Sequence, residues 1–353
     1  MNVCEIVDKI TSGYRPDVSE VSTLLSARGE DAKYVFSTAA RVRDAHFGKR
    51  TFIYGFVYFS TYCRNNCSFC YYRRTNDLER YRKSPDEIIS LSHSLKDAGI
   101  NLVDLTMGED PHMCANGYSE LIEIVRRVKE EVDISVMVSP GSMPENIFAK
   151  FKDAGADWFA CYQETYNRDL FKRLRLEQDF DHRVNQRIWA RKTGLLAEDG
   201  MMVGLGETVM DRAEALLRMG ESGCEQIRAM TFVPQSGTPM EVMAPADAHN
   251  ELISIATMRI LFPERFIPAS LDVEGIAGLK TRIDAGANVI TSIIPPNINL
   301  AGVAQHELDI DNGHRSVNHV LDMLNDMGRR AATNSEYESA LANLRKKSER
   351  DHT

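Results

Sequence analysis

One local pattern, present five times, restricts the fold of this 353-residue chain more than any other feature of its sequence. In each copy, a segment with apolar residues at helical spacing ends in glycine, and a short apolar segment follows at once. Glycine closes a helix in the left-handed conformation, so each copy predicts a turn from a helix into a strand. The five glycines are Gly99, Gly155, Gly194, Gly223 and Gly286. The repeat therefore predicts an α/β fold in which helices and strands alternate.

Three more apolar segments raise the number of predicted strands to eight. Thr51 to Phe59 is rich in aromatic and β-branched residues, and segments near Ile134 to Val138 and Phe266 to Leu271 fill the remaining gaps. Eight alternating units over about 250 residues predict a closed (β/α)8 TIM-type barrel, which we place at residues 51–330. A doubly wound open sheet is the structural alternative. In both folds the ligands bind at the carboxyl ends of the strands.

The two ends of the chain are predicted to lie outside this barrel. Residues 1–50 predict three helices, Val3 to Ile10, Glu20 to Leu25 and Asp31 to Phe47, which we expect to form a helical cap over one end of the barrel. Residues 331–353 are expected to form a C-terminal helix or tail. The basic run from Arg345 to Arg350 is typical of a solvated tail.

The charge and hydropathy of the chain argue against two classes of partner. A net charge of −9 and a pI near 5.6 disfavour a nucleic-acid surface, because phosphate binding needs clustered Lys and Arg. No apolar run reaches the roughly 18 to 20 residues of a membrane span, and the first ten residues carry charges where a signal peptide would be apolar. We therefore expect a cytoplasmic protein that binds neither membrane nor nucleic acid.

Three cysteines follow the first predicted strand in a C-x3-C-x2-C spacing: Cys63, Cys67 and Cys70. Thiolates bind iron and zinc, and cysteines this close in one loop can converge on one centre. A closed structural zinc site needs four ligands, and no Cys or His lies within the ten residues after Cys70. In a cluster of four irons, by contrast, three thiolates leave one iron open. The spacing favours an iron–sulfur cluster, and a zinc site completed from a distant segment is the alternative.

The cysteine spacing, with Phe69 directly before the last cysteine, resembles the signature of the radical S-adenosylmethionine (SAM) enzymes. In that family the open iron of a [4Fe–4S] cluster chelates the amino and carboxylate groups of SAM, and one electron from the cluster yields a 5′-deoxyadenosyl radical. The resemblance implies that Cys63, Cys67 and Cys70 hold a [4Fe–4S] cluster and that Phe69 lies beside SAM. It also implies an electron donor such as flavodoxin or ferredoxin.

The end of the second predicted strand resembles the Gly-Gly-Glu stretch that meets the methionine amine of SAM in this family. Gly108 and Glu109 match that stretch, whereas Met107 replaces its first glycine. The resemblance implies that Gly108 and Glu109 bind SAM. An acidic loop in water is the alternative.

Two later stretches are similar to the biotin synthase and hydrogenase-maturation branch of the family. Glu164, in Gln-Glu-Thr, and Arg183, nineteen residues on, resemble that branch's SAM-binding Glu-Thr and Arg. Gly204 begins a Gly-Leu-Gly-Glu-Thr run that is also similar. A guanidinium matches a carboxylate, and a glycine lets backbone approach a flat ligand, so the chemistry fits SAM. A Glu164–Arg183 salt bridge at the barrel rim is the alternative.

Four polar residues on predicted strands indicate a substrate pocket. Ser270 and Asp272 are two residues apart on one predicted strand, so their side chains share a face. Two polar side chains that point into a barrel need a partner or a function, because burying them unpaired is costly. Arg228 could bind a carboxylate, Asp272 with Ser270 an ammonium, and Asp104 a second ammonium. Together they describe a pocket for an amino acid, and an Arg228–Asp272 ion pair that only fills the barrel is the alternative.

Within the branch, the resemblance is strongest to the methylornithine synthase family of pyrrolysine biosynthesis. It implies a redox-neutral carbon-skeleton mutase that converts L-lysine to 3-methylornithine, with Arg228, Ser270, Asp272 and Asp104 as substrate-binding residues. It rests on FVYFSTYCRNNCSFCYYRR, LVDLTMGEDP, CYQETYN, MMVGLGET, MTFVPQSGTPM and PASLDVEG.

Two other functions stay open from the residues alone. One is a biotin synthase-like or hydrogenase-maturation-like enzyme acting on another small substrate. A biotin synthase needs a second cluster with further cysteine ligands, and we interpret Cys4, Cys114, Cys161 and Cys224 as structural. The other is a non-catalytic iron–sulfur or zinc scaffold protein, for which an amino-acid pocket would have no use.

Overall fold

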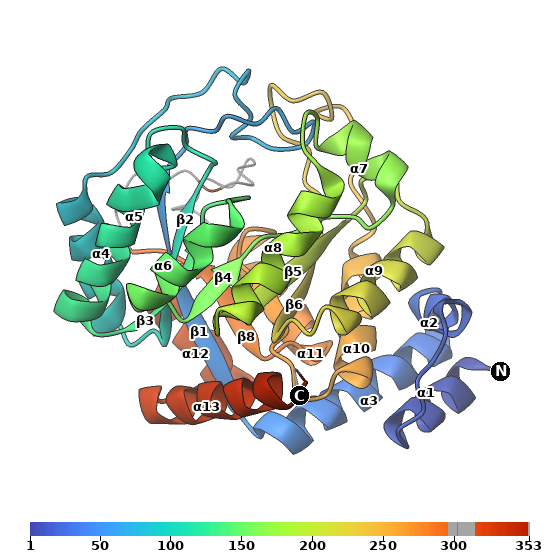
Figure 1. Cartoon of the computed structure of the whole chain (residues 1–353). Coiled ribbons are helices and arrows are strands. Elements are labelled where there is room, and N and C mark those ends of the chain that lie inside the picture. The colour runs from blue at the N-terminus through green and yellow to red at the C-terminus, as the bar shows by residue number, and fades with distance from the viewer. Residues whose placement is uncertain (296–301, 303–314, 352–353) are drawn as a thin grey trace.

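The predicted (β/α)8 barrel is present in the computed structural model (Figure 1). The structure describes residues 1–295, 302 and 315–351; of residues 349–351 it describes the backbone alone. Eight parallel strands pair in the order β6-β5-β4-β3-β2-β1-β8-β7. Parallel bridging between Gln226 and Phe266 joins β6 to the segment before β7 and closes the circle. The strands are β1 (Arg50–Ser60), β2 (Leu102–Met107), β3 (Ser135–Ser139), β4 (Trp158–Ala160), β5 (Leu196–Val203), β6 (Gln226–Thr231), β7 (Pro268–Ser270) and β8 (Val289–Ile293).

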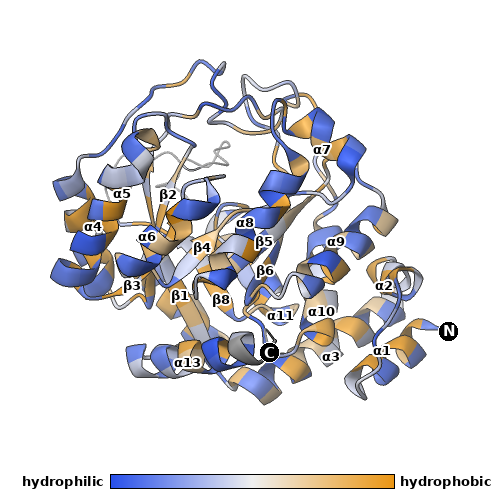
Figure 2. Cartoon of the chain, in the orientation of Figure 1, coloured by the Kyte–Doolittle hydropathy of each residue, from blue (hydrophilic) through white to orange (hydrophobic). Residues whose placement is uncertain are grey.

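Helices surround the barrel and bury their apolar faces against it (Figures 1 and 2). Because both faces of the strands are covered, β2 and β8 are buried at every residue, as is usual for parallel sheets. All five glycines of the repeated turn have positive φ, which confirms that prediction. The helices are α4 (Pro85–Asp97), α5 (Ser119–Arg127), α6 (Phe148–Asp153), α7 (Arg168–Leu174), α8 (Phe180–Lys192), α9 (Val209–Glu221), α10 (Ala248–Leu261), α11 (Leu279–Asp284) and α12 (Val317–Asp326).

The three predicted N-terminal helices are present as α1 (Val3–Thr11), α2 (Val18–Leu25) and α3 (Gly29–Phe47). Both α1 and α2 begin with a capping box, in which the N-cap side chain and the third helical residue satisfy each other's backbone N–H groups. The helices pack against α9 and α10, and the end of α3 brings Phe47 to the amino end of the barrel. The division of the chain at residues 50 and 330 stays a prediction.

The C-terminal helix α13 (Asn334–Asp351) lies across the amino ends of the strands (Figure 1). It follows a short strand, β9 (Arg330–Ala331), that pairs with β1. Tyr337, Leu341 and Leu344 are buried in an aromatic cluster with residues from β1 and β4. Arg345 pairs with Asp157, so the prediction that the basic run is a solvated tail is wrong for this residue. Residues 352–353 of the predicted tail lie outside the described part of the chain.

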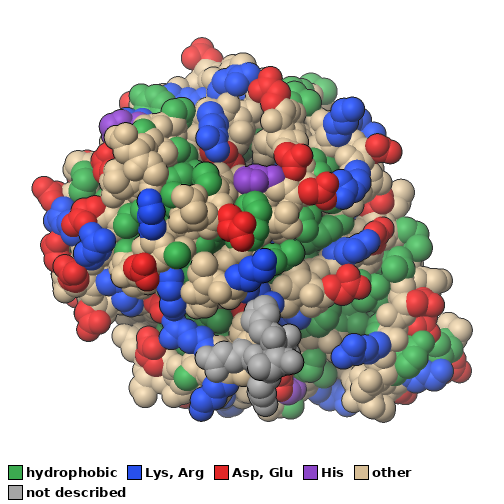
Figure 3. Space-filling model, in the orientation of Figure 1, with side chains coloured by type: hydrophobic (Ala, Val, Ile, Leu, Met, Phe, Trp, Pro, Cys, Tyr) green, Lys and Arg blue, Asp and Glu red, His purple; other side chains and the backbone are tan. Residues whose placement is uncertain are grey.

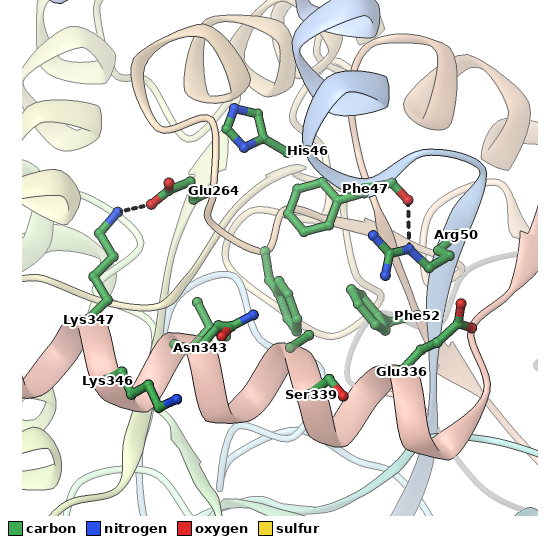
Figure 4. A pocket seen from close by; sticks show the side chains of 13 residues that line it. His46, Phe47, Arg50, Phe52, Glu264, Glu336, Ser339, Asn343, Lys346 and Lys347 are labelled. Atoms are coloured by element: carbon green, nitrogen blue, oxygen red, sulfur yellow. Dashed lines mark hydrogen bonds and ion pairs between the residues drawn. The ribbon is translucent and has the colours of Figure 1, made fainter.

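A cavity of about 390 Å³ lies between α13 and the amino ends of the strands (Figure 4). Its floor is aromatic, and the rings of Phe52 and Phe266 stack with centroids 4.6 Å apart. The acidic groups at its rim are paired, Glu264 with Lys347 and Glu336 with Arg330. Although large, this cavity is at the end of the barrel opposite the cysteine loop.

The surface mixes both signs of charge on the face in Figure 3, where Lys and Arg alternate with Asp and Glu. A search of the described residues for a helix of sufficient length and apolarity to cross a bilayer found none.

Candidate active site

A cavity of about 200 Å³ lies at the carboxyl ends of the strands, beneath the cysteine loop that follows β1. All but two of the thirteen predicted site residues line it; Gly204 and Ser270 do not. Those that do are Cys63, Cys67, Phe69, Cys70, Asp104, Gly108, Glu109, Glu164, Arg183, Arg228 and Asp272. The fold therefore brings together residues from five strands or the loops that follow them and from α8.

The three cysteines are free thiols, with Cys67 buried and Cys63 and Cys70 half-buried. Burial raises the pKa of Cys63 to about 11 and also raises the pKa of Cys70. Thiols in this environment ionise when a metal replaces their protons. Among the described side chains, no three of Cys, His, Asp or Glu are grouped closely enough to hold a single ion.

The cysteine loop is held by contacts with distant segments. The Arg64 backbone N–H donates to the carbonyl of Glu109 at 3.0 Å, and the Ser68 N–H donates to the carbonyl of Leu174 at 2.8 Å. Gly108 passes so close to the loop that a Cβ would lie 2.3 Å from the carbonyl oxygen of Tyr62. A side chain at residue 108 would therefore push the loop away from β2.

Glu109 and Arg183 face each other across the cavity wall. Glu109 accepts from Arg64 Nε at 3.0 Å and from the Ser142 N–H at 2.9 Å, and its Oε1 lies 3.6 Å from Arg183 Nη1. Arg183 also donates from Nε to the Tyr162 carbonyl at 2.7 Å. This part of the cavity presents a guanidinium and a carboxylate side by side, as the amino-acid part of SAM would require.

Glu164 pairs with Arg175, with Nη2 and Oε1 2.6 Å apart. The alternative Glu164–Arg183 salt bridge is therefore not formed. Glu164 has a φ of 66°, a left-handed conformation that is uncommon outside glycine and frequent at functional sites. Arg175 was not predicted, because eleven residues and helix α7 separate it from Glu164.

Gly204 lies at the end of β5 but off the cavity. Its N–H donates to Glu207 Oε1 at 2.9 Å, and a Cβ there would lie 2.4 Å from the Cβ of Ala246. With a φ of 99°, this residue lets two loops pack closely.

Arg228 on β6 pairs with Glu198 on β5, not with Asp272. Its Nε lies 2.6 Å from Glu198 Oε1, and its guanidinium lies 5.1 Å from the Tyr162 ring centroid. Both charged groups are buried, yet Arg228 Nη2 has no hydrogen-bond partner among the described residues. A buried unpaired donor on a cavity wall suits an anionic ligand group.

Asp272 is surrounded by donors. Tyr58 donates to Oδ1 at 2.9 Å, and Ser292 and Ser270 donate to Oδ2 at 2.6 and 3.1 Å. Arg315 completes the set with an ion pair. Burial alone would raise the pKa of Asp272, but Arg315 and the hydroxyls of Ser292 and Tyr58 hold it below its usual range. Ser270 thus contacts Asp272 from behind, away from the cavity.

Asp104 on β2 is only half satisfied. Ser139 donates to its Oδ1 at 2.7 Å, whereas Oδ2 makes no hydrogen bond of normal geometry among the described residues. Burial raises the pKa of this carboxyl to about 7, the Ser139 hydroxyl opposing and the charge of Glu198 adding to the effect. Asp104 lines the same cavity as Arg228.

Four side chains at the site escaped the sequence reasoning: Tyr58, Arg175, Glu198 and Arg315. One signal was available for Glu198, because an acidic residue in the middle of an apolar strand needs a buried partner. The others take their roles from partners that only the tertiary structure brings near.

Comparison with known proteins places this cavity in a family context. The model of the radical SAM superfamily matches residues 57–219. The chain is 42% identical over 335 residues to 3-methylornithine synthase of Methanosarcina barkeri, with 95% of each covered. It superposes on a crystal structure of methylornithine synthase (PylB) with a TM-score of 0.90 at 41% identity, covering 95% of this chain and 99% of the other. It is also 30% identical over 291 residues to the [FeFe] hydrogenase maturase subunit HydE of Thermotoga maritima, with 81% and 82% covered.

Proposed function

The chain belongs to the 3-methylornithine synthase family within the radical SAM superfamily, and from that membership we propose that it converts L-lysine to 3-methylornithine. SAM and an iron–sulfur cluster are the cofactors that the family implies. The similarity over 95% of the chain favours this family over the biotin synthases and over a non-catalytic scaffold. The observation that carries the proposal is one cavity that joins three thiols to an unpaired guanidinium nitrogen on Arg228 and to the carboxylates of Asp104 and Asp272.

In this proposal the cysteine side of the cavity holds the cofactors. Cys63, Cys67 and Cys70 bind a [4Fe–4S] cluster, which receives its electron from a donor such as flavodoxin or ferredoxin. When bound, the cluster and SAM together supply a radical that can take a hydrogen atom from an unactivated carbon. The three thiols on one wall fit such a cluster, because three ligands leave one metal atom free to bind SAM.

The SAM-binding residues are proposed from the charges beside the cysteines. Arg183 faces the carboxylate of SAM, Glu109 with the backbone of Gly108 faces its amine, and Glu164 accepts from its ribose hydroxyls. Phe69 supplies an apolar surface next to the cluster. Gly204 acts indirectly, by letting the loop after β5 pack close to residue 246.

The strand side of the cavity is proposed to hold lysine, which carries one carboxylate and two ammonium groups. Arg228 binds the carboxylate through Nη2, while Glu198 fixes the other edge of the guanidinium. Asp104 binds one ammonium through its open Oδ2. Asp272, oriented by Ser270, attracts the second ammonium. Four donors already occupy the carboxylate oxygens of Asp272, so the ammonium must displace Arg315 or share the carboxylate with Arg315.

The test is an anaerobic assay of the reconstituted full chain with dithionite, SAM and L-lysine, analysed by mass spectrometry. A new species with the mass of lysine and a different retention time is expected, together with 5′-deoxyadenosine. Formation of 5′-deoxyadenosine without any isomer of lysine would contradict the proposed substrate.

Asp272→Ala tests the pocket within the same assay. We expect this variant to keep the cluster absorbance and lose isomer formation, because the substrate ammonium loses its counter-charge. Product formation at the wild-type rate would remove Asp272 from the substrate site.

A further inference from the structure

Among the three cysteines, Cys67 has an environment that the other two lack. Two side chains donate toward its sulfur: Gln178 Nε2 at 3.0 Å and Arg175 Nη1 at 3.6 Å. The sulfur of Cys63, in contrast, accepts from the backbone N–H of Asn65 at 3.4 Å. The site is therefore asymmetric, with one buried thiol facing an amide and a guanidinium.

Both donors come from the turn between α7 and α8, residues 175–179, which is tied to the cysteine loop at other points as well. Ser68 donates through its N–H to the Leu174 carbonyl at 2.8 Å and through Oγ to the Arg173 carbonyl at 2.8 Å. Arg74 pairs with Glu177 at 3.1 Å. These contacts join residues that follow Cys67 to the end of α7 and to the turn itself, and so fix the position of the turn relative to the sulfur.

The orientation of the Gln178 amide follows from its second partner. Arg183 Nη1 lies 3.3 Å from Gln178 Oε1, and a guanidinium has donors only. The oxygen of the amide must therefore face Arg183, which turns the NH2 group toward Cys67. Gln178 thus connects a cluster thiol to the guanidinium proposed to bind the carboxylate of SAM.

Arg175 adds positive charge at the same sulfur. Its guanidinium is buried, pairs with Glu164 at 2.6 Å and lies 5.3 Å from the ring centroid of Phe69. Because Glu164 neutralises the charge in part, the N–H groups that point to Cys67 contribute mainly as hydrogen-bond donors. Hydrogen bonds to the sulfur ligands and the burial of a cluster are among the factors that set its reduction potential.

We infer that Gln178 and Arg175 are positioning residues that raise the reduction potential of the cluster through Cys67. Adding an electron increases the negative charge on the sulfur ligands, so donors stabilise the reduced cluster more than the oxidised one. The inference rests on the proposed binding of a cluster by the three cysteines. It assigns a role to two residues outside the cysteine motif.

The experiment is a redox titration of the anaerobically reconstituted full chain, followed by electron paramagnetic resonance of the reduced cluster without SAM or lysine. Gln178→Leu is the main variant, because it removes the donor at 3.0 Å without breaking an ion pair. Arg175→Leu would leave Glu164 buried without its partner and is not informative. The matched control is Arg173→Gln, at an exposed position two residues before Arg175.

We expect Gln178→Leu to make reduction about threefold to tenfold less favourable, where tenfold corresponds to about 59 mV for one electron. Arg173→Gln should match the wild type. An unchanged midpoint in Gln178→Leu, or an equal shift in the control, would overturn the inference. If the wild type gave no cluster signal, the proposed function itself would fail.

A second variant covers the case in which Gln178→Leu loses iron. Gln178→Glu keeps the length of the side chain and a partner for Arg183 but replaces the donor by a carboxylate, so a lower midpoint is again expected. A wild-type midpoint in this variant would contradict the inference. Iron loss from both variants would also contradict it, since Gln178 would then be needed for assembly and not for tuning.

Discussion

Two carboxylates at opposite ends of the barrel, the half-buried Asp157 and the buried Asp104, differ in how completely they are paired. At the amino end, Asp157 accepts from Ser135 at 2.9 Å and pairs with Lys129 and Arg345. At the carboxyl end, Asp104 has one partner and one open oxygen. Burial would raise both pKa values, but the cations hold that of Asp157 below its usual range, whereas that of Asp104 rises to about 7.

The contrast extends to the two cavities. The amino-end cavity is the larger, about 390 Å³ against about 200 Å³, but the acids at its rim are paired. The carboxyl-end cavity carries unsatisfied atoms on Asp104, Thr106 and Arg228. Unpaired buried polar atoms cost free energy unless another group satisfies them, and these three lie on residues that line the candidate site.

The strongest test of this contrast compares cysteines at the two ends. Cys67→Ala removes a proposed cluster ligand, and we expect loss of the iron-dependent absorbance and of all SAM cleavage. Cys224→Ala changes another buried thiol, just before the amino end of β6, and should retain both the absorbance and SAM cleavage. Iron analysis and 5′-deoxyadenosine formation measure the two effects. Equal loss in both variants would show that the amino end also contributes to the cluster site.

A second test removes the aromatic residue through which α13 seals the amino end. Tyr337→Ala deletes a buried side chain whose hydroxyl accepts a hydrogen bond from Trp158 Nε1 at 3.1 Å. We expect the free energy of unfolding to fall by about 3–5 kcal/mol, since large buried side chains cost this much when truncated. Chemical denaturation measures the loss. The cluster content of the folded protein should not change, and a change would couple the two ends.

The pH dependence of substrate binding sharpens the comparison of the carboxylates. If Asp104 binds an ammonium, it must be ionised, so the KM for lysine should fall as pH rises through about 7, by up to about tenfold per unit below that pKa. Asp104→Asn should give a high KM that does not vary in this range. A wild-type profile in this variant would mean that another group titrates.

The contribution of Asp104 to the stability of the protein should change with pH in the opposite direction to the contribution of most paired acids. The native pKa of about 7 exceeds the unfolded value of about 3.9, so the native state binds more protons between these limits. The contribution of Asp104 to the free energy of unfolding therefore declines as pH rises from about 4 to 7. Asp104→Asn should remove this component, which urea denaturation at several pH values would measure.

The smallest effect is expected from filling the amino-end cavity. Ala340 on α13 is half-buried at this cavity, and Ala340→Met adds volume with a flexible side chain. We expect the free energy of unfolding to rise by about 0.5–2 kcal/mol with kcat and KM unchanged. A specific loss of activity without loss of stability would show that this cavity has a ligand of its own.

Local signals made most of the fold, and the grouping of the three cysteines at the candidate site, predictable. The helix-to-strand turns depend on single glycines, and Cys63, Cys67 and Cys70 lie within eight residues of one another. Arg228 was found because a polar residue on an apolar strand stands out against its neighbours; Asp272 was expected on the next such strand, but β7 ends at Ser270 and Asp272 lies in the turn that follows. In each case the information lies within a few residues of the position.

The pairings could not be predicted, because they join segments that are distant in the chain. Arg228 selects Glu198 over Asp272, and Asp272 takes Arg315, forty-three residues further on. The covering role of α13 was missed for a related reason: Tyr337, Leu341 and Leu344 form an apolar stripe in a helix that is otherwise polar. Such a stripe does not tell which surface it will cover.

The way the barrel closes bears on how such an enzyme changes over evolution. The strands that carry Arg228 and lead to Asp272 are β6 and β7, which meet at the Gln226–Phe266 bridging near their bases, whereas β1 and β2 pair along six positions. Substitutions in the loops beyond this seam can shift the two strand ends apart without breaking a ladder of hydrogen bonds. The width of the pocket can thus change where β6 meets β7, while the wall formed by β1 and β2, next to the proposed cofactor site, stays fixed. A lineage could in this way exchange one amino-acid substrate for a longer or shorter one and inherit its radical chemistry unchanged.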